Sequence, residues 1–141
     1  MIYGEVSFGR PFITGFIVLP RLMLGDEISF LVDTGADRTV IQPRDAVKLG
    51  IEHQRTFAGA PVVVSRGIGG NAEEYVEPGL VLFRHNDEKW DHLLVLLYFA
   101  KPTPENASDP SILGRDVISY YRLVFEQRAG LVTLANTAQQ A

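Results

Sequence analysis

Phe30-Leu31-Val32-Asp33-Thr34-Gly35-Ala36-Asp37 places a carboxylate at the end of an apolar strand and inside a tight turn. The preceding apolar side chains alternate as in a half-buried strand, and Gly35 permits the backbone conformation of a sharp turn. Burying a charge here costs several kcal/mol unless the carboxylate is hydrogen-bonded or shares a proton. We therefore expect Asp33 to have a partner, although Asp-Thr-Gly alone also opens many ordinary turns.

A glycine-rich segment, Arg66-Gly67-Ile68-Gly69-Gly70, lies between two apolar stretches and is predicted to form the tip of a β-hairpin. Its glycines would let backbone N–H groups approach a bound chain closely, and Ile68 would offer one apolar contact. A plain hairpin turn fits the same pattern. A phosphate-binding loop fits less well, because no Lys-Ser or Lys-Thr pair follows.

The third informative segment, Ser111-Ile112-Leu113-Gly114-Arg115-Asp116, begins about 80 residues after the Asp-Thr-Gly sequence. It consists of two apolar residues and a glycine followed by a charged pair. By itself this pattern fits the end of a strand and the start of a solvated helix. Its meaning therefore depends on the other two segments.

Taken in order, these segments resemble the active-site signature, the flap and the second signature of the retropepsin-like aspartic proteases, the family of the retroviral proteases and their cellular relatives. The resemblance extends from residue 28 to residue 118. It implies a mostly β chain that forms one lobe, closed like a β-barrel, with a flap hairpin and one or two short helices. Between Gln42 and Gly59 the chain is longer than in the smallest viral enzymes, so the resemblance is looser there.

The resemblance assigns roles to the first segment. Asp33 would be the catalytic residue, in an active-site loop that also contains Thr34, Gly35, Ala36 and Asp37. Thr34 would form a hydrogen bond across a two-fold axis, and Gly35 would offer backbone groups to the substrate. Asp37 would contact the peptide backbone or structure the loop.

In the third segment, the resemblance implies structural support for the loop and the dimer. Arg115 would open a short helix and pair with an acidic group, for which Asp37 is the predicted partner. Cleavage of extended peptides with apolar residues around the scissile bond is then expected. The other supporting residues would be Gly114 and Asp116, and the residues lining the substrate would be Val40, Gly67, Ile68, Gly69 and Ile112.

Chain length constrains how such an enzyme could work. With 141 residues the chain is long enough for one domain, 1–141, and too short for two aspartic-protease lobes. It contains only one Asp-Thr-Gly, whereas the chemistry needs two carboxyls that share a proton and hold a water. We therefore expect a symmetric homodimer in which each subunit supplies Asp33.

The chemistry implied needs no metal and no cofactor, because one carboxylate activates a water while the protonated carboxyl polarises the scissile carbonyl.

Two departures from the family pattern bear on activity. Ala36 has no hydroxyl to donate to the carboxylate, which moves the expected optimum toward weakly acidic pH. Arg38 stands where the viral enzymes often have an acidic or polar residue, which would favour acidic side chains in a substrate pocket.

Composition disfavours several other partners. A net charge of −4 without a basic stripe argues against nucleic acid or an anionic membrane. The longest apolar run, Leu93 to Ala100, is far shorter than a membrane-spanning helix and predicts a buried strand. Because the first residues lack the pattern of a signal peptide and the chain has no cysteine, a cytoplasmic location is expected. The histidines are scattered, and a solvated hairpin explains the acidic residues near His92 better than a metal site does.

Outside the three segments the sequence predicts short strands, turns and little helix. A helix is expected at 43–49, because Pro43 suits its first position and Gly50 the position after its end. The single Trp90 is predicted to lie in the core, and residues 136–141 are expected to fray. By resemblance, the terminal strands 2–6 and 131–135 are candidates for a sheet shared between subunits. The other predicted strand pairs are 12–19 with 27–32, 80–84 with 90–98, and 122–126 with 131–135.

Two rival functions remain open at this point. The chain could be a binding or dimerisation module that keeps the fold but has lost turnover, although the intact Asp33-Thr34-Gly35 sequence argues against degeneration. A glycosidase with paired carboxylates is less well supported, because no second acidic residue lies in a comparable strand-turn setting.

Overall fold

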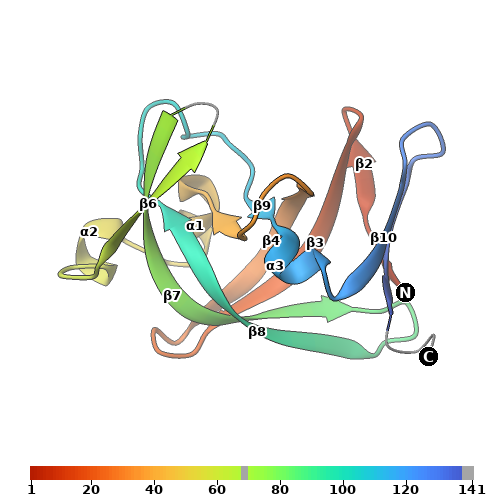
Figure 1. Cartoon of the computed structure of the whole chain (residues 1–141). Helices are drawn as coiled ribbons and strands as arrows, with labels where there is room; N and C mark the ends of the chain where they lie inside the picture. The colour runs from red at the N-terminus through yellow and green to blue at the C-terminus, as the bar shows by residue number, and fades with distance from the viewer. Residues whose placement is uncertain (68–69, 138–141) are drawn as a thin grey trace.

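The computed structural model describes residues 1–67 and 70–137, and strands dominate this part of the chain (Figure 1). The helices are short: α1 (Pro43–Lys48), α2 (His53–Thr56) and α3 (Arg115–Ile118). The strands are β1 (Ile2–Tyr3), β2 (Glu5–Ser7), β3 (Arg10–Leu19), β4 (Leu24–Val32), β5 (Val40–Ile41), β6 (Val62–Gly67), β7 (Gly70–Arg84), β8 (Trp90–Ala100), β9 (Ile112–Leu113), β10 (Tyr121–Glu126) and β11 (Leu131–Asn136).

The larger sheet closes on itself. Its strands follow the order β2-β3-β4-β9-β5-β8-β7-β6, and a further pairing joins β3 to β7 through Phe16 with Leu82 and Val18 with Leu80. Because β3 also pairs with β4, the strands from β3 to β7 form a ring, which is the predicted barrel-like lobe. The predicted strand pairs are all present, so the mostly β fold is confirmed.

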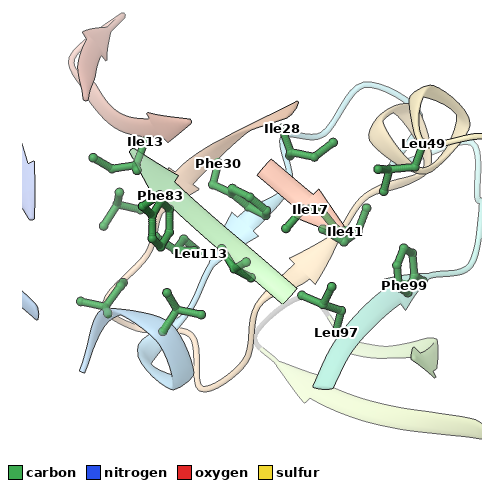
Figure 2. Packing of buried hydrophobic residues seen from close by; sticks show 14 of the residues in the cluster. Ile13, Ile17, Ile28, Phe30, Ile41, Leu49, Phe83, Leu97, Phe99 and Leu113 are labelled. Atoms are coloured by element: carbon green, nitrogen blue, oxygen red, sulfur yellow. The ribbon is translucent and has the colours of Figure 1, made fainter. Parts of the chain in front are cut away.

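The core fills the interior of this ring. Phe30 of β4, Phe83 of β7 and Phe99 of β8 are fully buried and lie among aliphatic side chains from the facing strands (Figure 2). Leu113 of β9 is also fully buried, and only Gly114 separates it from α3. At about 25 cal/mol per Å² of apolar surface removed from water, these large side chains are the main source of stability. The core thus packs beneath the ends of β4 and β9, where the Asp33 loop and α3 begin.

The helix predicted at 43–49 forms as α1. Pro43 occupies its first turn, and the chain leaves the helix through Gly50, whose φ of 92° is unfavourable for other residues. The sequence does not predict α2, which follows within the region where the family resemblance is loosest. With α3 the structure therefore has more helices than the one or two expected, each no longer than six residues.

The prediction that the Leu93–Ala100 run is a buried strand is wrong for one face of β8. Side chains alternate across a strand, and the outward positions Leu94 and Leu96 are 75% and 53% exposed, while Leu97 is fully buried. Trp90, predicted in the core, lies on the same outward face and is 51% exposed. The run is apolar on both faces, so the sequence alone does not reveal that only one face is covered.

The terminal strands form a second, three-stranded sheet in the order β1-β11-β10. Ile2 pairs with Leu134 in β11, and Leu134 pairs with Leu123 in β10, so both edges of β11 are occupied within the chain. The strand at 131–135 is therefore paired on both sides within the chain, and its place in a sheet shared between subunits stays a prediction. The predicted strand 2–6 is also divided at Gly4, after which β2 pairs with β3 in the larger sheet. Asn136 belongs to β11, and 138–141 lie outside the described residues.

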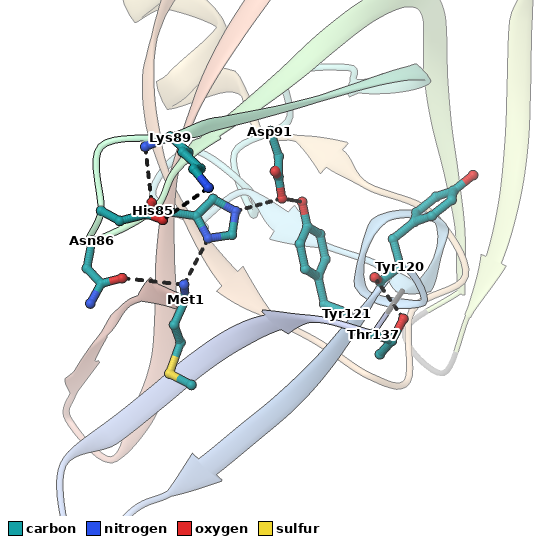
Figure 3. Close-up of polar contacts among 9 residues, drawn as sticks. Met1, His85, Asn86, Lys89, Asp91, Tyr120, Tyr121 and Thr137 are labelled. Atoms are coloured by element: carbon teal, nitrogen blue, oxygen red, sulfur yellow. Dashed lines mark hydrogen bonds and ion pairs between the residues drawn. The ribbon is translucent and has the colours of Figure 1, made fainter. Parts of the chain in front are cut away.

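A polar network joins the two sheets at the β7–β8 turn (Figure 3). His85, which is 6% exposed, lies 2.9 Å through Nε2 from Asp91 Oδ2, and its Nδ1 accepts a hydrogen bond from the Met1 amino group at 2.9 Å. The Tyr121 hydroxyl donates to the same Asp91 oxygen at 2.8 Å. Burial alone would raise the pKa of Asp91, but these hydrogen bonds outweigh it and the pKa is lowered. Burial, with help from Asp91, raises the pKa of Tyr121, so its hydroxyl stays protonated.

The lowered pKa of Asp91 predicts a pH-dependent contribution to folding. Asp91 contributes fully to the free energy of unfolding above its pKa in the unfolded chain, about 4. The contribution is lost as pH falls through the lower pKa that Asp91 has in the folded protein. Asp91→Asn should therefore reduce the free energy of unfolding at pH 7 by about 1 kcal/mol, with a smaller difference near pH 3. Urea unfolding of both proteins at the two pH values measures this. A difference that is the same at both would contradict the assignment.

Candidate active site

The Asp33 loop leaves the end of β4 and turns immediately. Asp33 is half-buried, and its Oδ1 accepts a hydrogen bond from the Gly35 backbone at 2.9 Å. The Ala36 N–H donates to the Asp33 carbonyl at 3.2 Å, which closes the turn. Thr34 and Gly35 are exposed at its tip. The carboxyl is thus held by its own loop while remaining open to solvent, and the hydrogen-bonding partner expected for Asp33 is present.

The second signature segment lies directly beside this loop. β9 pairs with β4 in parallel, and the backbone of Asp33 donates to the Leu113 carbonyl at 3.0 Å. Two residues earlier, Leu31 donates to the Ser111 carbonyl at 2.8 Å. Because parallel strands end at the same edge of a sheet, Asp33 and Gly114 leave the sheet side by side. Two segments about 80 residues apart are therefore joined at the candidate site.

Arg115, the first residue of α3, fixes the outer side of the loop. Its guanidinium pairs with Asp37, as the sequence predicts, and also donates to the Thr34 carbonyl at 3.2 Å. Its backbone N–H donates to the Ala36 carbonyl at 2.9 Å. The Arg115 and Asp37 side chains are 53% and 77% exposed, so solvent weakens their charge attraction. Arg115 positions the loop mainly through the two directed contacts of its guanidinium, with Asp37 and with the Thr34 carbonyl.

Thr39 and Asp116 form a second, buried connection that the sequence does not reveal. Asp116 accepts hydrogen bonds from the Thr39 backbone at 2.9 Å and from the Thr39 hydroxyl at 2.7 Å. The Thr39 hydroxyl oxygen in turn accepts from the Gly114 N–H at 3.2 Å, and Thr39 is fully buried. Asp116 is among the residues predicted to support the loop, but its partner is distant in sequence and carries no motif. The only local signal is a threonine that closely follows Asp-Thr-Gly.

A similar connection lies behind the loop. The Ser111 hydroxyl donates to Asp45 at 2.6 Å and accepts from the Gln42 N–H at 2.9 Å. Ser111 is fully buried and Asp45 is 7% exposed, so the buried carboxylate of α1 has the hydrogen bond that burial requires. These contacts tie α1 to the second signature segment.

Gly114 is needed because the two backbones approach too closely for any side chain. A Cβ at this position would lie 2.5 Å from both the carbonyl carbon and the carbonyl oxygen of Arg38. Real Cβ atoms do not come so near, so one of the two segments would have to move.

Gly114→Ala should therefore destabilise the protein by about 1–3 kcal/mol, because Arg38 and β9 must separate. Thermal and urea unfolding measure the loss. Gly130→Asn is the matched control, because no atom lies within 4 Å of its Cβ position and asparagine tolerates its φ of 64°. Equal stability of the two variants would show that the close approach does not constrain the site.

The apolar residues predicted to line the substrate are partly assembled. Val40 in β5 and Ile112 in β9 are register partners, and both are half-buried. Gly67 ends β6 and pairs with Gly70 across the predicted hairpin. Ile68 and Gly69, the other two residues assigned to the substrate, lie outside the described residues.

A family profile described as aspartyl protease matches residues 21–117, which include the Asp33 loop, β9 and the start of α3. The chain belongs to the aspartyl protease family. The family resemblance found in the sequence is therefore confirmed. Among curated protein sequences, none matches this chain.

Two solved structures of aspartic proteases are similar to this chain, and the first of them shares its fold. A retropepsin-like aspartic protease from Rickettsia conorii is 16% identical with a TM-score of 0.58, over 93% of this chain and 95% of that one. The EIAV protease complexed with the inhibitor HBY-793 is 22% identical with a TM-score of 0.49, over 78% of this chain and 86% of that one. The aspartyl protease described here thus has the single-lobe, retropepsin-like fold.

An aromatic cluster supports the base of the β6–β7 hairpin of this aspartyl protease. The Phe57 ring stacks on Tyr75 of β7 with centroids 4.7 Å apart, and His53 of α2 lies 5.8 Å from Phe57. Neither ring nitrogen of His53 has a hydrogen-bond partner among the described residues. Burial lowers the pKa of His53, because a protonated ring here would lose its hydration without gaining an acceptor.

The lowered pKa of His53 makes folding less favourable in acid. The unfolded chain binds the proton on His53 more readily than the folded protein does. Burial of the neutral ring therefore contributes to the free energy of unfolding above about pH 6.5, and this contribution is lost as pH falls toward the pKa of His53 in the folded protein. His53→Phe should shrink the difference between the urea midpoints at pH 7.5 and pH 5. His92→Gln is the control, because that ring is exposed on the outer face of β8. An unchanged difference in His53→Phe would contradict the assignment.

Within 1–67 and 70–137, no three histidine or acidic side chains lie together in a way that could hold a metal ion. No helix in the same part of the chain is long and apolar enough to cross a membrane.

Proposed function

We propose that this chain is an aspartic endopeptidase that hydrolyses peptide bonds as a homodimer, with one Asp33 from each subunit in the active site. The observation that carries the proposal is the fixed geometry of the Asp33 loop. Its carboxyl stays open to solvent while Leu113, Arg115 and the loop backbone hold the surrounding turn. A carboxyl held in a fixed position and open to solvent is suited to acid–base chemistry.

Two Asp33 carboxyls across a two-fold axis would share one proton, because two negative charges a few ångströms apart repel each other strongly. The pair would hold one water between its members. No metal or cofactor is needed for the steps that follow.

Hydrolysis proceeds through proton transfers between the dyad, the water and the peptide. The charged carboxylate takes a proton from the water as its oxygen attacks the scissile carbonyl carbon. The protonated carboxyl donates its proton to the carbonyl oxygen, giving a neutral diol. As the diol collapses and the C–N bond breaks, the carboxyl that is now protonated gives its proton to the leaving nitrogen, and the other carboxylate takes a proton from one diol hydroxyl, so that the products are a carboxylic acid and an amine. One proton remains on the dyad, as at the start.

Other residues would position the substrate and the loop. Thr34 is exposed at the tip, where its hydroxyl can reach across the two-fold axis, and Gly35 offers backbone groups to the peptide. Val40 and Ile112 form an apolar floor, which favours apolar residues around the scissile bond. The β6–β7 hairpin would act as the flap through Gly67, Ile68 and Gly69.

Dimerisation through a shared sheet has fewer routes than the sequence suggests. Both edges of β11 are paired within the chain, so in the described part of the terminal sheet the edges left to a partner are those of β1 and β10. Tyr121–Glu126 forms the longer of these edges. The second subunit is required for the proposed chemistry because each chain contains one Asp-Thr-Gly.

The test is cleavage of a mixed peptide library between pH 4 and pH 7 by the purified protein and its Asp33→Asn variant. We expect cleavage at bonds flanked by apolar residues, and a loss of at least a thousandfold, on the order of general acid–base effects, in the variant. Asn keeps the shape of the side chain and its bond from Gly35, so the variant should remain folded and dimeric. Light scattering at each pH reports the oligomeric state.

Cleavage retained by Asp33→Asn would refute the mechanism. A folded dimer that cleaves no peptide would instead favour the rival function, a binding module that keeps the fold without turnover. Arg115→Gln is an informative companion, because it removes the pair with Asp37 without touching the dyad and should lower activity less than Asp33→Asn does.

A further inference from the structure

An open cleft of about 320 Å³ lies where the start of β8 meets the terminal sheet. A volume of roughly 300 Å³ is at the lower end of ligand sites, so this cleft has room for one long side chain. Its walls come from three strands and from the turn after α3, and they include Trp90, Asp91, Tyr120, Tyr121 and Asn136. None of these residues belongs to the segments that form the candidate active site.

Two aromatic side chains of this cleft are open to solvent. Trp90 is 51% exposed and Tyr120 is 60% exposed. The face of an aromatic ring carries negative charge density and attracts cations, most strongly in tryptophan. Among cationic side chains arginine suits such a wall best, because its planar and weakly hydrated guanidinium stacks on aromatic faces.

Asp91 adds a carboxylate that a ligand can reach from the cleft. Its side chain is 24% exposed, and the contacts from His85 and Tyr121 both use Oδ2 (Figure 3). Asn136 also hydrogen-bonds the Asp91 side chain. Because a carboxylate has about four acceptor positions, these three contacts leave capacity for a further donor. A guanidinium can supply that donor from its edge while its face packs against a ring.

The charges around the cleft favour the same kind of ligand. Among the described residues that line it there is no lysine or arginine, and Asp91 is the one acidic residue. Arg84 and Lys89, which flank the β7–β8 turn, each pair with an acidic residue of that turn. The imidazole of His85 separates the Met1 amino group from Asp91. The carboxylate and the aromatic faces therefore both attract a cation.

We propose that this cleft binds an arginine side chain presented by a segment of a partner protein. The guanidinium packs against the rings of Trp90 and Tyr120 and donates to the Asp91 carboxylate. Leu94, which is 75% exposed on the same outward face of β8 as Trp90, offers apolar surface to the residues that flank the arginine. The site does not use Asp33, so the inference goes beyond the proposed function and does not depend on it.

The chain's single tryptophan lines the cleft, so its signals report binding there directly. The probe is acetyl-Gly-Arg-Gly-amide, whose glycines do not resemble the apolar residues expected around a scissile bond. It is titrated into the purified protein while the Trp90 fluorescence and the Trp90 indole N–H signal in a proton–nitrogen correlation spectrum are recorded. Matched peptides carry citrulline, which has nearly the same shape without the charge, or lysine in place of the arginine.

We expect a saturable change in both Trp90 signals with the arginine peptide. The affinity for the citrulline peptide should be about tenfold lower, because the charge-assisted hydrogen bond to Asp91 is lost. The lysine peptide should also bind more weakly than the arginine peptide, because an ammonium does not stack. Rising salt should weaken binding of both charged peptides.

Variants of the cleft separate stacking from charge. Tyr120→Leu should lower the affinity for the arginine peptide about threefold, whereas Tyr120→Phe keeps the aromatic face and should keep the affinity. Tyr3→Leu is the matched control, because Tyr3 is 56% exposed on the terminal sheet and does not line this cleft. Asp91→Asn should remove the preference for arginine over citrulline, with its fold checked in the same spectrum.

Three results would overturn the inference: no saturable change in the Trp90 signals, equal affinity for the arginine and citrulline peptides, or an affinity that Tyr120→Leu leaves at the wild-type value. The Tyr120 variants keep the test decisive if Asp91→Asn does not fold. The titration is repeated with Asp33→Asn, which should bind the arginine peptide as the wild type does. A protein that cleaves no peptide but binds arginine in this way would refute the protease proposal and leave the present inference standing.

Discussion

The candidate site depends on the junction between the Asp33 loop and the segment from β9 to α3. Backbone hydrogen bonds from Asp33 to Leu113 and from Arg115 to Ala36 join the two segments directly. The Arg115 fork and the Asp116–Thr39 hydrogen bonds then fix the loop from two sides. A single carboxylate is useful in catalysis only if its position is fixed to a fraction of an ångström, and this junction supplies that precision through the backbone.

The junction forms because the closed sheet holds β9 beside β4. β9 has only two residues, too few to be stable as an isolated strand, but it lies between β4 and β5 inside a continuous ring. The fully buried side chains of Ile41 in β5 and Leu113 in β9 hold these two short strands against the core. The ring also explains why exposed loops can carry the candidate site, since the strands beneath them do not depend on the loop sequence.

Local sequence was informative where one segment determines its own conformation. The Asp-Thr-Gly turn, the helix that begins at Pro43 and the hairpin strands follow from nearby residues, and the Asp37–Arg115 pair follows from family resemblance. Burial of the β8 run does not, because Leu93 to Leu97 are apolar on both faces and only packing decides which face is covered. Tyr98 beneath Arg38 and Thr39 beside Asp116 were equally inaccessible, since each contact joins residues about 60 or more positions apart.

The doubly paired β11 separates folding from assembly. When terminal strands of two chains interleave, neither subunit completes its sheet alone, and folding becomes a second-order process. Here β1, β10 and β11 complete the terminal sheet within one chain. If the proposed homodimer forms from subunits that are already folded, the population of paired Asp33 residues follows the protein concentration through mass action. Local abundance would then set the activity of the proposed dimer.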